Sequence, residues 1–156
     1  MPTDKEKILF KNKLKQWGAD HIQQRVEAAR QAMQQAQDAA NSEEKSSVGD
    51  KYETGRAMGH LQKDMHARQL AAALQDLALL QAVPAEMSYR EGAPGAVLEV
   101  EGMALFISVG LGKQSVEGRT VLFLSPQAPL AKLLLKKQMG TSVSFNQKTV
   151  VIEDIY

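Results

Sequence analysis

The fold of this 156-residue chain is decided by the stretch NSEEKSSVGD, residues 41–50, which separates two helical patterns. Its residues are polar and favour turns. A short connection between two helices whose apolar seams face each other forms an antiparallel hairpin. We therefore expect a helical hairpin whose tip, at about residues 42–53, is presented to solvent rather than packed.

The segments on either side of this turn carry apolar residues at helical spacing. Before the turn, a heptad seam runs through Ile22, Val26, Ala29, Met33, Ala36 and Ala40. After it, a second pattern begins near Glu53 and runs through Met58, Leu61 and Met65, then Leu70, Ala73, Leu77 and Leu80. Alternating steps of three and four predict a coiled-coil partner for each helix. The segment 70–83 is apolar around much of its circumference, so we expect it to be more buried than the rest.

The chain changes character near Pro84, where Gln- and Ala-rich sequence gives way to short runs of Val, Leu, Phe and Ile divided by glycines. We place a boundary there, with a helical hairpin at 1–84 and a second domain at 85–156. That domain reads as strands at 96–100, 103–109, 120–125, 142–145 and 149–155, with turns at 101–102, 117–118 and 146–147 and a further hairpin turn at 110–113. One short helix is expected at 129–137, beginning with Pro129. The predicted fold class is α+β, a hairpin followed by a small antiparallel sheet with one helix.

Composition excludes several kinds of site. The chain has no cysteine, which rules out disulfides, thiolate nucleophiles and Cys-ligated metals. The net charge of +1 does not favour general nucleic-acid binding, and no run of about 18 apolar residues predicts a membrane span. The spacing of His21, His60 and His66 does not suit a metal site. The N-terminal lysines are either a solvated terminus or a basic patch at the base of the hairpin: Lys5, Lys7, Lys11, Lys13 and Lys15.

The strongest local motif is Gly49-Asp50-Lys51-Tyr52-Glu53, at the start of the second helical pattern. Asp50 and Glu53 are three residues apart, so Asp50 can cap the helix and Glu53 can reach back to it in a capping box. The same spacing puts two carboxylates on one exposed turn, where they could help to hold a hard divalent cation. Two carboxylates alone make a poor Mg²⁺ site, so a partner would have to supply further ligands.

Together, the hairpin, the acidic tip and the sheet-plus-helix domain resemble the Gre transcription elongation factors (GreA/GreB), as a shorter and divergent member. The family's tip reads Gly-Asp-Leu-Lys-Glu-Asn-Ala, and residues 49–55 here read Gly-Asp-Lys-Tyr-Glu-Thr-Gly. The stretch SPQAPLA at 125–131, followed by Leu133-Leu134, resembles the family's Ser-x-x-Ser-Pro-hydrophobic segment before its short helix. The resemblance covers about residues 15–156.

This resemblance implies an FKBP-like second domain that binds RNA polymerase and a hairpin that enters the polymerase's secondary channel. Asp50 and Glu53 would be the catalytic, metal-assisting pair, helping to retain a Mg²⁺ ion shared with the polymerase and not bound stably by the factor alone. The polymerase's own two-metal chemistry would then cleave backtracked RNA, whose 3′ end the factor contacts only indirectly. The resemblance further implies a cytoplasmic monomer that is no enzyme by itself, makes no membrane contact and is associated with DNA binding.

Two other functions stay open at this point. Arg56, Gly55 and Gly59 depart from the family's pattern and favour a non-catalytic regulator that occupies the same channel and inhibits or retunes the polymerase. A prolyl isomerase with a helical dimerisation arm would need a pocket lined by aromatic side chains. The second half offers only Tyr89, Phe106, Phe123, Phe145 and Tyr156 for that pocket.

Overall fold

The computed structural model describes residues 2–46 and 49–156, with the side chains of 43–46, 49–53 and 56 left out. The chain forms two compact units. One consists of Asp20–Leu77, and the other joins Met1–Ala19 with Ala78–Tyr156. The first residues of the chain therefore belong to the same unit as the β domain, whereas the sequence pattern divides the chain at residue 84.

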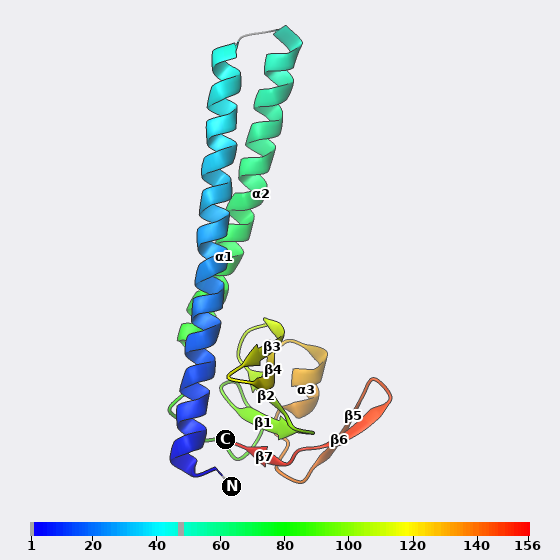
Figure 1. Cartoon of the computed structure of the whole chain (residues 1–156). Helices are drawn as coiled ribbons and strands as arrows, with labels where there is room; N and C mark the ends of the chain where they lie inside the picture. The colour runs from blue at the N-terminus through cyan, green and yellow to red at the C-terminus, as the bar shows by residue number, and fades with distance from the viewer. Residues whose placement is uncertain (1, 47–48) are drawn as a thin grey trace. The chain divides into compact units, whose positions relative to one another are not determined.

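Two long helices account for the N-terminal half. Helix α1 spans Asp4–Ser46 and helix α2 spans Gly49–Gln81 (Figure 1). The expected turn at 41–50 is thus helical at 41–46 and 49–50, where Glu43, Glu44 and Lys45 are good helix formers. Helix α2 also begins earlier than predicted, at Gly49 instead of near Glu53. Asp50 is therefore already inside the helix and does not precede it as a cap.

The predicted seam of α1 is confirmed within the unit Asp20–Leu77. Burial follows the alternating steps of three and four: Ile22, Val26, Ala29, Ala36 and Ala40 are buried, and Met33 is half-buried. Burying one narrow stripe while the polar face stays in water is what holds a helix pair together. In Figure 1 the two helices of this unit run side by side.

The seam of α2 differs from the prediction near the tip. Met58, Leu61 and Met65 were expected to face α1, but all three are exposed. The less exposed positions are instead occupied by small or polar residues: Gly55, Gly59, Lys63, His66 and Ala67. Helix α2 therefore turns its small side chains toward α1 and its large apolar side chains outward.

The physical reason is a close helix–helix contact at Gly59. A Cβ atom at this position would lie 3.0 Å from the Cβ of Ala40 and 3.7 Å from the carbonyl oxygen of Ala36. Such short spacing is possible only where both helices carry minimal side chains. Next to it, the Lys63 ammonium donates a hydrogen bond to Oε1 of Gln37 at 2.7 Å. These contacts orient the tip end of α2.

The segment 70–83 is less buried than predicted. Ala73, Leu80 and Val83 are buried, and Leu70 and Leu77 are half-buried, as the predicted stripe requires. Leu74 and Leu79 are exposed. Only one stripe of this segment is therefore buried.

The β domain contains a five-stranded sheet in the order β3-β4-β2-β1-β7 and a two-stranded sheet of β5 and β6. The elements are β1 (Val97–Val100), β2 (Met103–Ile107), β3 (Gly112–Val116), β4 (Arg119–Leu124), α3 (Pro129–Leu134), β5 (Ser142–Phe145), β6 (Lys148–Val151) and β7 (Asp154–Ile155). The predicted fold class, a helical hairpin followed by a small β domain with one short helix, is confirmed. The sheet is mixed, however, because β2 and β4 pair in parallel.

The predicted turns are confirmed at three hairpins. Positive φ angles occur at Glu101-Gly102, Glu117-Gly118 and Asn146-Gln147, as two-residue hairpin turns require. The prediction of a fourth hairpin turn at 110–113 is wrong. Strand β4 lies between β2 and β3 in the sheet, and residues 112–116 form β3 itself. The polar side chains of β3 hid it from the sequence pattern.

The five-stranded sheet is covered on both faces within its unit. One face forms the core with Ala131 and Leu134 of α3, through Leu98, Leu105, Ile107 and Leu124 among others. The other face packs against the start of α1, where the ring of Trp17 stacks on Phe123 with 5.5 Å between centroids. A Cβ atom on Gly18 would lie 2.9 Å from Leu80 and 3.4 Å from Phe123. The base of the hairpin is therefore part of the β domain's core.

Replacing Gly59 by leucine is expected to destabilise the hairpin. The new side chain would collide with Ala40, and overpacking of this kind costs about 1–3 kcal/mol. Urea denaturation followed by circular dichroism would measure the loss. The control is Ala71→Leu on the same helix, where the side chain is exposed. Equal stability of both variants would contradict the close contact at Gly59.

Candidate functional site

The acidic pair at the hairpin tip lies in the first turns of α2. The backbone is helical from Gly49, so Asp50 and Glu53 occupy the second and fifth residues of the helix. Residues three apart on a helix share one face. Their side chains lie outside the described residues, as does the Arg56 side chain. The roles of Asp50 and Glu53 as metal-assisting residues therefore stay a prediction.

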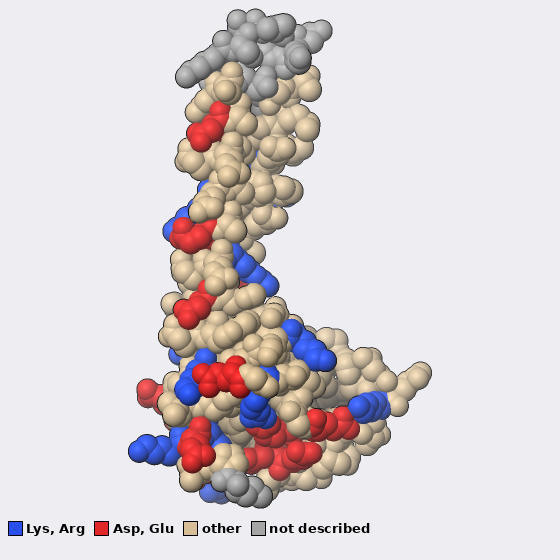
Figure 2. Space-filling view, viewed as in Figure 1, with Lys and Arg blue, Asp and Glu red and all other residues tan. Residues whose placement is uncertain are grey.

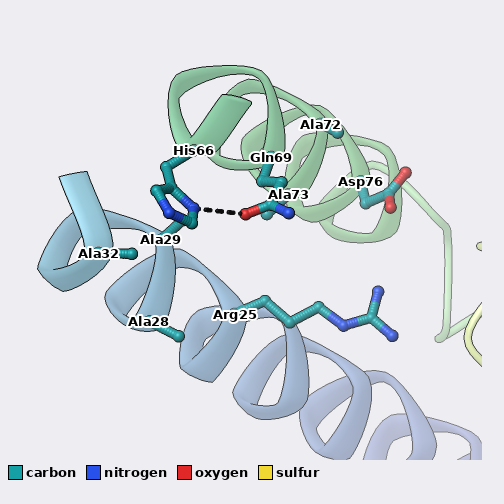
Figure 3. A pocket seen from close by; sticks show the side chains of 9 residues that line it. All are labelled: Arg25, Ala28, Ala29, Ala32, His66, Gln69, Ala72, Ala73 and Asp76. Carbon is teal, nitrogen blue, oxygen red and sulfur yellow. Dashed lines mark hydrogen bonds between the residues drawn. The ribbon is translucent and has the colours of Figure 1, made fainter. Parts of the chain in front are cut away.

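A groove of about 530 Å³ runs between the helices of the unit Asp20–Leu77 (Figure 3). Small side chains form much of its lining, because Ala28, Ala29, Ala32, Ala72 and Ala73 leave space between the two backbones. Polar groups border it: Arg25, His66, Gln69 and Asp76. Nδ1 of His66 lies 3.0 Å from Oε1 of Gln69, so the imidazole is engaged by its own helix. We find no catalytic arrangement in this groove.

Three of the five N-terminal lysines, Lys7, Lys11 and Lys15, make structural contacts, whereas Lys5 and Lys13 are exposed. The structure therefore corrects both alternatives for the first three. Lys11 is fully buried, with 0% of its surface exposed. Its ammonium donates hydrogen bonds to the carbonyl oxygens of Met87 at 2.7 Å and Gly95 at 3.0 Å. It also lies 4.7 Å from the centre of the Tyr89 ring. Burial lowers the pKa of Lys11 to about 8.

The neighbouring lysines are also engaged. Lys15 donates to the carbonyl oxygens of Gln81 at 3.0 Å and Val83 at 2.8 Å, where α2 ends. Lysine beside the last carbonyls of a helix satisfies groups that have no partner within the helix. Lys7 forms an ion pair with Asp154 at 2.7 Å. Lys11 and Lys15 thus fasten α1 to the segment that follows α2.

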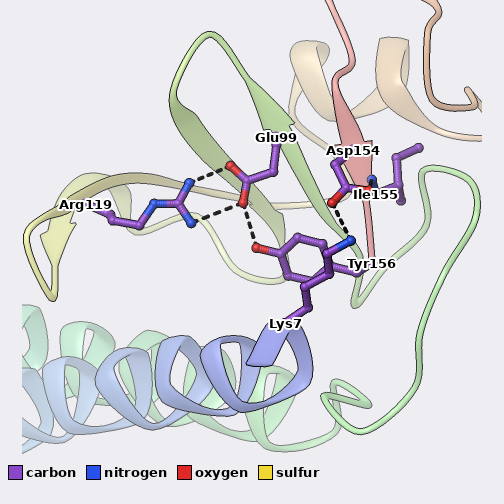
Figure 4. Close-up of polar contacts among 6 residues, drawn as sticks. All are labelled: Lys7, Glu99, Arg119, Asp154, Ile155 and Tyr156. Carbon is purple, nitrogen blue, oxygen red and sulfur yellow. Dashed lines mark hydrogen bonds and ion pairs between the residues drawn. The ribbon is translucent and has the colours of Figure 1, made fainter. Parts of the chain in front are cut away.

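A second polar cluster lies on the face of the sheet that packs against the start of α1 (Figure 4). Arg119 donates two hydrogen bonds to the carboxylate of Glu99, at 3.1 and 2.5 Å. The Tyr156 hydroxyl donates to the same carboxylate at 2.7 Å. The Arg119 guanidinium lies 4.9 Å from the centre of the Phe10 ring. Burial, followed by the hydrogen bond to Glu99, raises the pKa of Tyr156. This cluster ties β1, β4 and the last residue to α1.

The charged surface of the β domain includes a basic group at α3. Lys132 lies on α3, Lys136 and Lys137 follow it, and all three are exposed beside the exposed Leu133. On the face shown in Figure 2, basic and acidic side chains are interspersed over the molecule. The group at α3 is therefore a local patch within a mixed surface.

The described residues contain neither a metal-binding cluster nor a membrane-spanning helix. Among residues 2–46 and 49–156 with described side chains, no three His, Asp or Glu residues gather in a way that could hold a metal ion. Over the same part of the chain, no helix combines the length and the apolar character that a membrane crossing needs.

The sequence pattern missed the anchoring role of Lys11 and Lys15. One signal was available: both lysines lie four residues apart on a helix whose neighbours Leu14 and Trp17 are apolar. A lysine on an apolar face of a helix must find buried acceptors or extend its head to water. The acceptors here are backbone carbonyls, which no side-chain pattern can indicate.

The chain resembles a solved structure but matches no family model and no curated sequence. Among solved structures, the chain matches that of the transcription factor Gfh1 at 18% sequence identity. The match covers 89% of this chain and 93% of that chain, with a TM-score of 0.35.

The buried amine of Lys11 predicts a pH dependence of stability. Its pKa is about 8 in the folded protein against an ordinary value of 10.5, so the unfolded chain binds more protons between these two pH values. The free energy of unfolding, relative to a Lys11→Met variant, should therefore rise by on the order of 2 kcal/mol from pH 8 to pH 10.5.

Urea denaturation across this pH range would test the dependence, with Lys5→Met as the control because Lys5 is exposed. A fall in the relative stability of the wild type over the same range would mean that the two carbonyl acceptors hold the amine in its charged form.

The Glu99 cluster predicts unequal effects for its members. Glu99→Ala removes the acceptor shared by Arg119 and Tyr156, and is expected to cost about 1–3 kcal/mol of stability. Tyr156→Phe leaves the Glu99–Arg119 pair intact and should cost about 1 kcal/mol. Thermal denaturation of both variants measures the difference. Equal losses would indicate that the arginine pair contributes nothing.

Proposed function

We propose that this chain is a Gre-type factor that binds RNA polymerase, inserts its hairpin into the secondary channel and stimulates cleavage of backtracked RNA. The observation that carries this proposal is the Gly-Asp-x-x-Glu motif in the first turns of α2, at the end of a long helix pair. The resemblance of the whole layout to the Gre factors supports it.

The dimensions of the hairpin suit a part that reaches into a larger assembly. Helix α2 has 33 residues and is about 50 Å long at about 1.5 Å per residue. Its partner α1 has 43 residues. The acidic motif lies in the first turns of α2, at the opposite end of this helix from Gln81.

The residues at the tip suit a shared Mg²⁺ ion in their chemistry. Asp50 and Glu53 supply carboxylate oxygens, which are the ligands that Mg²⁺ prefers, and their spacing puts both on one face of a helix. Two carboxylates leave most of an octahedral shell open for water and for ligands from the polymerase. The ion, when bound, would supply charge stabilisation for phosphodiester hydrolysis at the polymerase's active site. The contribution of this chain is to position the two carboxylates.

The β domain is the proposed attachment to the polymerase. Its basic group, Lys132, Lys136 and Lys137, is exposed and would suit an acidic surface. We propose that the factor acts as a cytoplasmic monomer, that its contact with the RNA 3′ end is indirect, and that it is no enzyme when alone.

One alternative function keeps the same partner. A non-catalytic regulator would occupy the channel without promoting cleavage, and the departures at Gly55, Arg56 and Gly59 favour it. A prolyl isomerase is disfavoured, because Phe106 and Phe123 are buried in the core rather than available to line a pocket.

Substituting both tip acids is expected to abolish stimulation of cleavage and to leave binding intact. An Asp50→Asn, Glu53→Gln variant keeps the size of both side chains and removes their charge. Gel analysis of RNA from stalled elongation complexes should show at least tenfold slower shortening than with the wild type. The matched control is Asp38→Asn, an exposed acid on α1.

Three outcomes separate the alternatives. Cleavage by the double variant at the wild-type rate would refute the acidic-tip mechanism. Binding of the wild type without any shortening of the RNA would select the regulator. No binding of the wild type to core polymerase would end the proposal as a whole.

A further inference from the structure

Helix α2 carries its large apolar side chains on the side away from α1. The exposed fractions are 54% for Met58, 67% for Leu61 and 49% for Met65. We call these three residues the outer stripe. They follow one another by three and four residues, so they lie along one face of the helix. An unpartnered apolar stripe on a solvated helix costs solubility and commonly marks a contact surface.

A shallow hollow on α2 lies beside the outer stripe. This hollow of about 480 Å³ is lined by Thr54, Ala57, Met58 and Leu61. The stripe residues are three and four positions apart, which is the spacing at which a second helix packs alongside in a coiled coil. Methionine side chains are flexible and adapt to irregular apolar surfaces. The occupant that fits is therefore an apolar, helical segment of protein.

The charge around the stripe argues against nucleic acid as the occupant. Gln62 and Gln69 are exposed nearby, and Asp64 and Arg68 carry opposite charges one helical turn apart. A phosphate backbone needs an excess of lysine and arginine. Among the described side chains of residues 54–69, Lys63 and Arg68 against Asp64 leave an excess of one positive charge, and the Lys63 ammonium is already engaged by Gln37. So small an excess does not suit a phosphate backbone.

The size of the stripe argues against a second copy of this chain. Three half-exposed side chains offer roughly 300 Å² of apolar area, whereas a stable interface buries about 800 Å² on each partner. The stripe alone is too small to hold a dimer. The apolar area of the stripe is large enough to add to an interface that other parts of the chain form with the same partner.

The stripe also lies close to the tip. Met58 follows Glu53 by five residues, which is about 7.5 Å along a helix. Any cavity that admits the tip acids must admit the outer stripe as well. We propose that the outer stripe binds an apolar helical surface on the wall of the polymerase channel and so fixes the depth and rotation of the tip. This inference rests on the proposed function.

The test uses the full-length chain with Met58→Gln, Leu61→Gln and Met65→Gln together. All three side chains are exposed, so folding should be retained, which circular dichroism verifies. The matched control is Leu74→Gln, an exposed leucine of the same unit and helix outside the stripe. Affinity for core polymerase is measured by competition with labelled wild type, and self-association by sedimentation.

The triple variant should bind core polymerase at least tenfold more weakly, and Leu74→Gln should bind as the wild type does. Unchanged affinity of the triple variant would overturn this inference and leave the proposed function standing. Dimers of the wild type that the triple variant cannot form, with equal polymerase affinity, would also overturn it in favour of a second copy. Absence of any binding by the wild type would overturn both proposals.

Discussion

The buried ammonium of Lys11 is the contact on which the base of this molecule depends. It links α1 to the carbonyl oxygens of Met87 and Gly95, which belong to the segment between α2 and β1. Lys15 repeats the arrangement one turn later at the end of α2. A buried cation is costly unless it is well satisfied, so each position tolerates few alternatives. The start of α1, the end of α2 and the sheet are thereby held as one compact unit.

Much of the fold could be predicted from the sequence, because its signals are local. The seam of α1 from Ile22 to Ala40 and the hairpin turns such as Glu117-Gly118 depend on short-range spacing. The parallel pairing of β2 with β4 could not be predicted, since it depends on the path of the whole chain. Strand β3 was not predicted for a different reason. Its side chains are mostly polar and exposed, so the sequence shows no alternation of apolar residues there.

The candidate site was predicted only in part. Asp50 and Glu53 could be selected because the motif is short and continuous, and their helical backbone agrees with a shared face. The orientation of α2 near them was predicted wrongly. Met58 and Leu61 have the right spacing for an inner seam, but the contact between Gly59 and Ala40 favours a closer approach than large side chains allow. Hydrophobic periodicity identifies a stripe and does not say which neighbour will cover it.

The division of the chain into units bears on how the length of the helix pair can vary between related sequences. Residues 20–77 form a unit of their own, and the segments that precede and follow them are joined through Lys11, Lys15 and Trp17. Removing seven residues from each arm would keep the heptad phase and shorten the helix pair by about 10 Å. The contacts made by Lys11, Lys15 and Trp17 lie within the other unit and would be unchanged. Insertions or deletions of seven residues in both helices would therefore change the length of the helix pair in related chains. The contacts within the other unit would need no change.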